Sequence, residues 1–307
     1  MAMNILFCSD DGYFVHAATA IHSAWFNNRD AHFFLADSGI DPAALKTFSD
    51  FAESIGLRLT VVRIEPDQLA DIPATLTNHM GNYLRLLLAR MLPETVERII
   101  YLDSDLVVIG DLGPLWSMDL EGRTIAGAQD DNAMRFEIRK GFARKDATKY
   151  LNSGVLLIDL AKWRENDCEK RLIDVIGSHE RLPHHDQSAI NLALPDEALL
   201  ISTRWNFIPV IAWDEGRVPE QPVVVHYAGA CKPWLHTDAL FGELYRFHRK
   251  ALPCDFEEPV LRYRSRARYL LNLALLRPKY FGRLVWERKF GRALSRDYLR
   301  QAQPGRG

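Results

Sequence analysis

Short apolar runs and amphipathic segments alternate along the first hundred residues. The runs at 4–8, 32–36 and 57–64 are rich in apolar, β-branched or aromatic residues, which is typical of strands. Between them apolar residues recur at helical spacing, and the clearest such segment begins at Asp41 and Pro42 and stops at Gly56. Alternating strands and helices predict a mostly parallel sheet covered by helices on both faces.

A further helix is expected over about 83–91, before Pro93, and the run "RIIYL" at 98–102 is expected to be a strand. This strand leads directly into Asp103 and Asp105. Ligands of open α/β sheets bind beyond the carboxyl ends of strands, so both carboxylates are expected at a site. Two carboxylates one residue apart can hold Mg²⁺ or Mn²⁺. An acidic turn with two solvated aspartates explains the same three residues about equally well.

Other polar groups interrupt apolar runs or stand in polar clusters of their own. They are Ser9, Asp10, Tyr13, Asn152, Gly154, Asp186, Gln187, His226, Gly229 and Lys232. Each has an ordinary structural explanation: an aspartate can cap a helix, an asparagine can end a turn, and a lone histidine is more often a satisfied core residue. Four such coincidences in one chain nevertheless favour a shared site.

This set of residues is suited to binding a diphosphate. A metal held by Asp103, Asp105 and His226 would neutralise the phosphates. Lys232 would add a point charge, and Gly229 would let the backbone approach the phosphate oxygens.

Composition restricts the class of protein that carries this site. The chain has 307 residues, 48% hydrophobic, with a net charge of −2, which predicts one large domain or one with an appendage and indicates no nucleic-acid partner. The four cysteines are scattered, without a CxxC pair or a preceding signal segment, which predicts reduced thiols in the cytosol. The longest apolar run, at 269–276, is far shorter than the ~20 residues of a membrane span.

The composition changes near residue 260. From 262 to 307 there are thirteen Lys or Arg and two acids, a net charge of +11, interleaved with aromatic residues. Anionic lipid attracts such a segment, and Tyr280, Phe281 and Trp286 can lie at the level of the headgroups. We therefore expect a tail over 261–307 that associates with a membrane surface. A solvated or nucleic-acid-binding tail is the alternative.

Seven motifs in order resemble those of a known family. They are "LFCSDDGY", "NYLRLLLA", "IIYLDSDLVVIGDLGPLW", "YLNSGVLLIDLAKWR", "HHDQSAIN", "RWNFIP" and "HYAGACKPW". This set is similar to that of the retaining glycosyltransferases of family 8, most of all to the bacterial lipopolysaccharide α-galactosyltransferases and glucosyltransferases. The similarity runs from about Met3 to Asp255.

The resemblance implies a GT-A fold over residues 1–260: a Rossmann-like, mixed, mostly parallel sheet flanked by helices. It implies a UDP-sugar donor and Mn²⁺, with Mg²⁺ possible, held by Asp103, Asp105 and His226. The nucleotide-binding positions are Cys8, Ser9, Asp10, Tyr13, Ser104, Gly229 and Lys232. The donor-sugar positions are Arg85, Asn152, Gly154 and Asp186, and the catalytic positions are Gln187, Asp186 and Asp130. Gly12, Ser188 and Ala189 depart from the residues that relatives often carry, which leaves the preference for sugar and acceptor open.

The predicted function is transfer of galactose or glucose, with retention, from UDP to a hydroxyl of a lipopolysaccharide-type or lipooligosaccharide-type glycan, at the inner face of the cytoplasmic membrane. Because an amide such as that of Gln187 is a weak nucleophile, displacement on the same face of the sugar is favoured. Alternatives are a self-glucosylating, glycogenin-like protein and a catalytically silent nucleotide-sugar-binding protein at a membrane surface. A nucleotidyltransferase would need a Gly-rich basic loop after the first strand, where this chain has the acidic "CSDDGYF".

Overall fold

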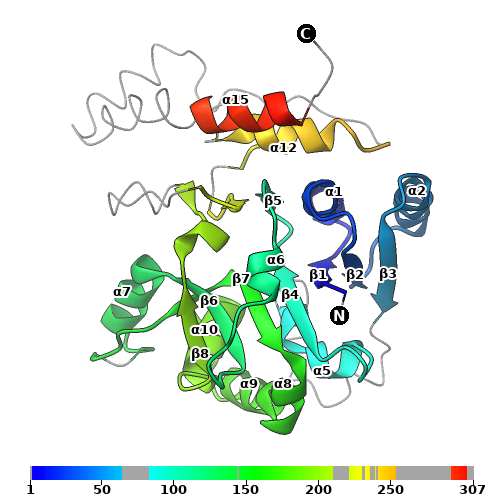
Figure 1. The fold of residues 1–307 in the computed structure, drawn as a ribbon. Helices are drawn as coiled ribbons and strands as arrows, with labels where there is room; N and C mark the ends of the chain where they lie inside the picture. The colour runs from blue at the N-terminus through cyan, green and yellow to red at the C-terminus, as the bar shows by residue number, and fades with distance from the viewer. Residues whose placement is uncertain are drawn as a thin grey trace.

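A seven-stranded mixed sheet forms the centre of the molecule (Figure 1). The computed structural model describes residues 2–63, 83–143, 145–209, 221–229, 232–235, 239, 241–253 and 292–302. The strands run in the order β3-β2-β1-β4-β7-β6-β8. Their bounds are β1 Asn4–Ser9, β2 His32–Asp37, β3 Arg58–Arg63, β4 Arg98–Leu102, β6 Ile125–Gln129, β7 Leu151–Asp159 and β8 Ala198–Ile201.

Strand direction changes in the middle of this sheet. The strands β3, β2, β1 and β4 run parallel to one another, whereas β7 runs antiparallel to both β4 and β6. Leu102 at the end of β4 pairs with Val155, so the first residues of β7 lie beside the last residues of β4. The GT-A fold with a mixed, mostly parallel sheet is confirmed.

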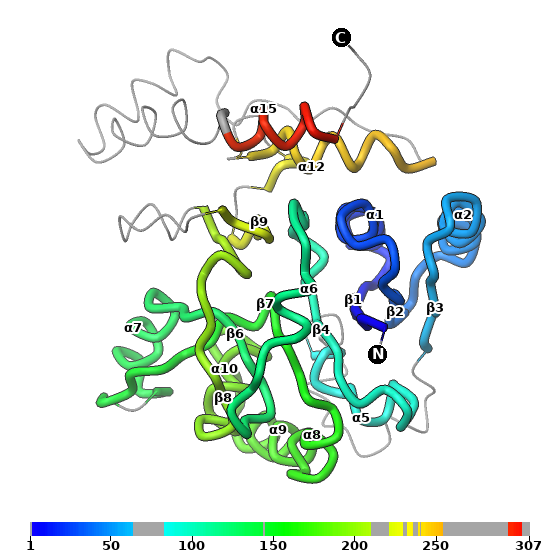
Figure 2. Tube along the Cα trace, in the orientation of Figure 1, coloured from blue at the N-terminus to red at the C-terminus, as the bar shows by residue number. Residues whose placement is uncertain are grey.

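Helices cover both faces of the sheet. Alternation along β1 sends Ile5 and Phe7 into an apolar cluster with α1 and α2, and Leu6 into a second cluster with α5, α8, α9 and α10. Figure 2 shows α1 and α2 together on one side of the sheet. The helix bounds are α1 Phe14–Asn27, α2 Pro42–Ser54, α5 Leu88–Met91, α6 Gly113–Trp116, α7 Asp131–Lys140, α8 Leu160–Glu165, α9 Cys168–Gly177, α10 His185–Ala193, α12 Gly242–Arg249 and α15 Arg292–Gln301.

A second, two-stranded sheet joins distant parts of the sequence. Strand β5 (Leu106–Val108) pairs antiparallel with β9 (Val224–His226). Val107 and Val225 belong to a third apolar cluster, which also contains Leu244 of α12, and Leu294 and Leu299 of α15 pack against it. The part of the basic tail at 292–302 thus packs against the domain. Residues 254–291, which include Tyr280, Phe281 and Trp286, and residues 303–307 lie outside the described residues.

The predicted elements agree with the structure, with one correction. The Asp41 side chain caps α2 by accepting hydrogen bonds from the Ala43 and Ala44 backbone N–H groups at 3.0 and 2.9 Å, and Gly56 follows the helix at φ +73°. The single helix expected over 83–91 is wrong, because it divides at Leu87 into a 3₁₀ turn (η2, Leu84–Leu86) and α5. In the part of the chain that the structure describes, no helix is long and apolar enough to span a membrane.

Candidate active site

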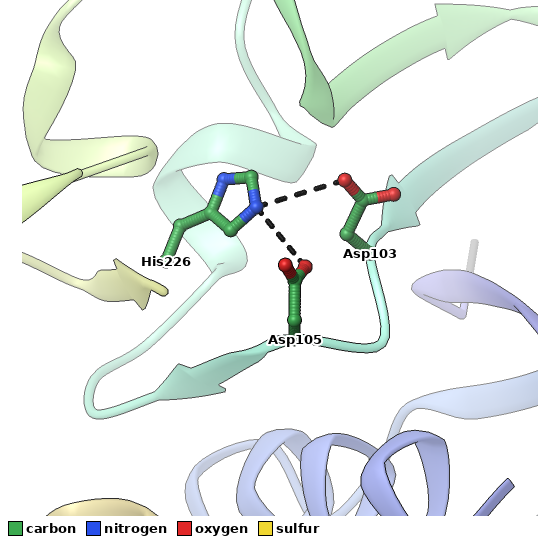
Figure 3. A group of neighbouring side chains, drawn as sticks. All are labelled: Asp103, Asp105 and His226. Atoms are coloured by element: carbon green, nitrogen blue, oxygen red, sulfur yellow. Dashed lines mark hydrogen bonds and ion pairs between the residues drawn. The ribbon is translucent and has the colours of Figure 1, made fainter. Parts of the chain in front are cut away.

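Three side chains converge where β4 ends. Asp103 leaves β4 with its backbone N–H bonded to the Gly154 carbonyl at 2.9 Å. The β5–β9 ladder pairs Leu106 with His226, which brings the imidazole beside Asp105. Figure 3 shows both carboxylates directed toward the ring: His226 Nε2 lies 3.1 Å from Asp105 Oδ1 and 3.7 Å from Asp103 Oδ2.

This cluster has the donor set of a divalent cation site. One ligand atom from each of Asp103, Asp105 and His226 lies within 4.8 Å of the other two. Carboxylate oxygens and an imidazole nitrogen suit Mn²⁺ and also admit Mg²⁺, which prefers oxygen. The residues present therefore fit a metal of this kind, and sequence reasoning had named all three.

Cationic side chains surround the carboxylates. Arg85, whose side chain is 12% exposed, bonds to Asp103, and its Nε lies 3.4 Å from Asp186 Oδ2, while Lys232 pairs with Asp105. Burial opposes the charge of Arg85, yet Asp103 and Asp186 raise the pKa of the guanidinium well above its usual value. Burial likewise acts against ionised Asp105, but His226 and Lys232 hold the pKa of Asp105 below its usual range. Arg85 and Asp105 therefore keep their charges although both are largely enclosed.

A cavity of about 290 Å³ opens beside the cation site. It contains most of the predicted nucleotide positions and Arg85; its lining residues are Cys8, Ser9, Asp10, Tyr13, Arg85, Tyr101, Asp103, Ser104 and Asp105. The Ser104 hydroxyl donates to the Cys8 carbonyl at 2.9 Å, which ties the turn after β4 to β1. Burial raises the pKa of the Cys8 thiol to about 12, so this cysteine is neutral and is no nucleophile.

Two predicted nucleotide positions also have structural roles. Asp10 Oδ1 accepts from the Tyr13 backbone N–H at 3.0 Å in the turn before α1, and no side chain caps that helix, so Asp10 orders the turn and the capping explanation is wrong. Tyr13 is 45% exposed and lines the cavity. Gly229 follows β9 at φ +87°, a conformation that favours glycine.

The predicted sugar-binding and catalytic residues form one buried group next to the cation site. Asp130 Oδ2 accepts from Asn152 Nδ2 at 3.0 Å and from Gln187 Nε2 at 3.2 Å. Asp130 Oδ1 accepts from the Ala133 N–H at 2.9 Å and thereby caps α7. Asp186 stands in the first turn of α10, where burial raises the pKa of its carboxyl against the opposing effect of Arg85.

Gly154 is required by the close approach of β7 to the cation site. A Cβ at this position would lie 2.2 Å from His226 Cε1 and 2.9 Å from Asp103 Oδ2. No side chain fits there without displacing the proposed metal ligands. The role of Gly154 is therefore to leave room for those ligands.

Sequence reasoning missed two residues of this site. The Tyr101 hydroxyl donates to Asp103 Oδ1 at 2.6 Å, and Asn206 Oδ1 lies 2.9 Å from His226 Nδ1. Tyr101 could have been found, because residues two apart in a strand share a face. Asn206 stands between Trp205 and Phe207 in the motif "RWNFIP", where a polar residue between two buried aromatic residues was the available signal.

Comparison with solved structures defines the class of fold. The galactosyltransferase LgtC, solved in complex with donor and acceptor sugar analogues, superposes with a TM-score of 0.71 at 26% identity, over 83% of this chain and 98% of that chain. The arrangement is therefore that of a GT-A glycosyltransferase. The sequence profile of glycosyl transferase family 8 matches residues 4–238, and the chain belongs to this family.

Curated relatives agree with this assignment. General stress protein A of Bacillus subtilis (strain 168) is 28% identical over 253 residues, 76% of this chain and 87% of that protein. A lipopolysaccharide 1,2-glucosyltransferase of Escherichia coli (strain K12) is 25% identical over 289 residues, 88% of this chain and 85% of that protein. The predicted similarity to lipopolysaccharide glycosyltransferases of family 8 is confirmed.

Proposed function

We propose that the protein is a metal-dependent, retaining hexosyltransferase that moves galactose or glucose from a UDP-sugar to a hydroxyl of a lipopolysaccharide-type or lipooligosaccharide-type glycan. The observation that carries this proposal is the cluster of Asp103, Asp105 and His226 at the edge of a cavity large enough for part of a nucleotide. The relatives support a hexose donor and a glycan acceptor, because the Escherichia coli protein is a lipopolysaccharide 1,2-glucosyltransferase and LgtC is a galactosyltransferase.

The charged residues of the site suit departure of a diphosphate. Mn²⁺, or Mg²⁺, bound by the two aspartates and the histidine would supply Lewis-acid stabilisation of the phosphate charge. Lys232 pairs with Asp105 from the loop after β9, so its ammonium would add positive charge for a diphosphate bound at this site. Arg85 pairs with Asp103 of the cation site and with Asp186, one of the residues proposed to bind the donor sugar. It thereby links the two groups.

The contacts of the candidate nucleophiles favour displacement on the same face of the sugar. Gln187 uses both ends of its amide: Oε1 accepts from the Ser153 N–H at 3.2 Å and Nε2 donates to Asp130. Both carboxylate oxygens of Asp130 are also engaged. An amide with a committed carbonyl is a weak nucleophile. We therefore expect the departing phosphate oxygen to help deprotonate the acceptor hydroxyl.

Two observations test this route. Replacing Gln187 with Ala is expected to leave substantial residual transfer, since the amide positions groups and does not attack. Isolation of a sugar adduct on Asp186 after incubation with donor would contradict same-face displacement and establish a covalent route.

The first test of the function is UDP release from a panel of UDP-sugars, with Mn²⁺ and with EDTA, by the wild type and by Asp103→Asn. We expect hydrolysis of one UDP-hexose, lost with EDTA and reduced by at least about 10³-fold in the variant, because a ligand of the cation is weakened. Asp37→Asn is the matched control, since Asp37 is a buried carboxylate paired with Arg63 outside the cavity. Turnover that is indifferent to EDTA would reject the proposal.

We also propose that the protein associates peripherally with the inner face of the cytoplasmic membrane through its basic tail. The excess of Lys and Arg after residue 260 supports this location, and the division into 1–260 and 261–307 stays a prediction. Deletion of the tail would remove α15, which packs against the domain, so charge substitution is the better test.

The membrane test compares two triple variants. Replacing Arg264, Arg266 and Arg268 with Gln is expected to reduce flotation with anionic phosphatidylglycerol vesicles by at least tenfold, at roughly 1 kcal/mol per charge. Replacing the exposed Arg58, Arg139 and Arg181 with Gln is the control for net charge. Equal flotation of both variants and the wild type would reject the tail as the anchor.

A further inference from the structure

A chain of side-chain hydrogen bonds connects the amino acids predicted to bind the donor sugar to the cation site. Asn152 Nδ2 donates to Asp130 Oδ2 at 3.0 Å, and Asn206 Nδ2 donates to Asn152 Oδ1 at 2.7 Å. Asn206 Oδ1 then meets His226 Nδ1 at 2.9 Å. We call these four residues, Asp130, Asn152, Asn206 and His226, the amide relay.

The direction of every hydrogen bond in the amide relay is fixed by the backbone. The Gly154 N–H can only donate, and it donates to Asn152 Oδ1 at 2.9 Å, which identifies that atom as the oxygen. Asn206 must therefore present its NH₂ group to Asn152 and its carbonyl oxygen to His226. A carbonyl oxygen only accepts, so His226 Nδ1 must carry a proton.

This polarity determines what His226 offers to a cation. With the proton held on Nδ1, the lone pair of the neutral ring lies on Nε2, the atom that faces Asp103 and Asp105. All four residues of the relay are at most 7% exposed, so water does not compete for these hydrogen bonds. Outer partners of this type orient a metal-binding histidine and select its tautomer.

We propose that Asn206 is a positioning residue that sets the metal-binding tautomer of His226 and couples the cation site to the donor-sugar residues. The coupling follows from Asn152, which is held by Asn206 on one side and by Asp130 on the other. Asp130 in turn holds Gln187. A rotation of the Asn206 side chain would therefore disturb both His226 and the hydrogen bonds that join Asn152, Asp130 and Gln187. This inference rests on the proposed function only for the identity of the metal and the sugar.

The hydrogen bonds made by the two ends of the Asn206 amide can be tested separately. Asn206→Ala removes both hydrogen bonds and is expected to raise the Kd for Mn²⁺, measured by calorimetry with the metal alone, by roughly 10- to 100-fold. Asn206→Asp keeps an acceptor for His226 Nδ1 but places an oxygen against Asn152 Oδ1. It is expected to keep the Kd for Mn²⁺ within about threefold of wild type while turnover of the UDP-hexose falls by roughly tenfold.

Asn28→Ala is the matched control. Asn28 is also a buried asparagine, 6% exposed, with backbone partners at Ala24, Gly110 and Leu112 away from the cation site. We expect this variant to lose stability and keep the Kd for Mn²⁺. An Asn206→Ala protein that binds Mn²⁺ as wild type does, or an Asn206→Asp protein that loses metal affinity or keeps full turnover, would overturn the proposal. If Asn206→Ala does not fold, the Asn206→Asp result decides.

The tautomer can be observed without metal or donor. Long-range ¹H–¹⁵N correlation spectra of the ¹⁵N-histidine-labelled protein at pH 9 should show His226 with a protonated Nδ1, and a fraction of molecules with a bare Nδ1 in Asn206→Ala. A bare Nδ1 in the wild type would overturn the relay. Absence of Mn²⁺ binding by the wild type would instead reject the metal-dependent function, so the two failures are distinguishable.

Discussion

Two clusters of buried titratable side chains respond to burial in opposite ways. In the cation site, Asp105 remains ionised because His226 and Lys232 outweigh the effect of burial on its pKa. Between α1 and α12, His22 Nδ1 and His248 Nδ1 lie 3.1 Å apart, and burial lowers the pKa of His22 to about 4 and that of His248 well below its usual value. The first cluster is charged and the second is neutral.

The difference shows which buried polar groups form a binding site. The histidine pair satisfies itself: His248 Nε2 bonds to the Tyr298 hydroxyl at 3.0 Å, and aromatic rings of α1 enclose His22. The carboxylates of the cation site, in contrast, line a cavity and repel one another. A cluster can bind a cation where carboxylates are held together beside open space, and it is structural where its members are uncharged and are hydrogen-bonded within the core.

Gly154→Ala should have the largest effect of the three variants, because it disturbs the charged cluster directly. The added methyl group meets His226 and Asp103, so we expect the Kd for Mn²⁺ to rise by at least about tenfold, with a stability loss of roughly 1–3 kcal/mol from overpacking. Gly110→Ala, which follows β5, is the control, because its Cβ meets Val223 Cγ1 at 3.4 Å, away from the ligands and from Asn152. Calorimetry and thermal unfolding separate the two outcomes. Unchanged metal affinity in Gly154→Ala would show that the cation site lies elsewhere.

Acid should destabilise the neutral cluster through His22. Its folded pKa of about 4 lies below the unfolded value of 6.5, so its contribution is complete above about pH 6.5 and is lost as pH falls toward 4. At pH 5 this linkage amounts to about 2 kcal/mol. Urea unfolding of wild type and His22→Gln at pH 7.5 and pH 5 measures it, since Arg29, His248 and His16 are common to both proteins. Equal losses in both proteins would contradict a neutral His22.

Tyr298→Phe should have the smallest effect of the three. It removes a hydroxyl that bonds to His248 and accepts from Asn27 Nδ2 at 2.9 Å, which joins α15 to α1 and α12. We expect a loss of about 1 kcal/mol of unfolding free energy, measured by urea titration, with metal-dependent turnover unchanged. A large loss of turnover would mean that α15 acts on the site directly.

The sequence predicted the parallel half of the sheet and the position of Asp103 and Asp105 at the end of β4, because each depends on local patterns. Strands at 4–9, 32–37, 58–63 and 98–102 follow from apolar runs, and Asp103 follows from the position of the last. The direction of β7 was not available from such patterns. Only an antiparallel β7 places its first residues, Asn152 and Gly154, beside the end of β4. A parallel strand would have put them at the opposite edge.

The remaining misses have physical causes as well. The expected helix over 83–91 divides at Leu87, whose ψ of 31° does not continue a helix, although the run "LRLLLA" has good helix formers throughout. Here tertiary packing overrides propensity. The place of Asn206 in the amide relay depends on long-range pairing of Phe207 with Val225, which no local motif records.

The β5–β9 ribbon also determines when the cation site can exist during synthesis. Asp105 and His226 are 121 residues apart in sequence, and only the pairing of β5 with β9 brings them together. Long-range strand pairing loses loop-closure entropy before it gains contacts. Such a strand pair therefore forms late in folding. A nascent or proteolysed chain that lacks β9 carries both aspartates and the residues that line the cavity, but it lacks His226. A metal held by all three side chains would therefore require the completed β5–β9 ribbon.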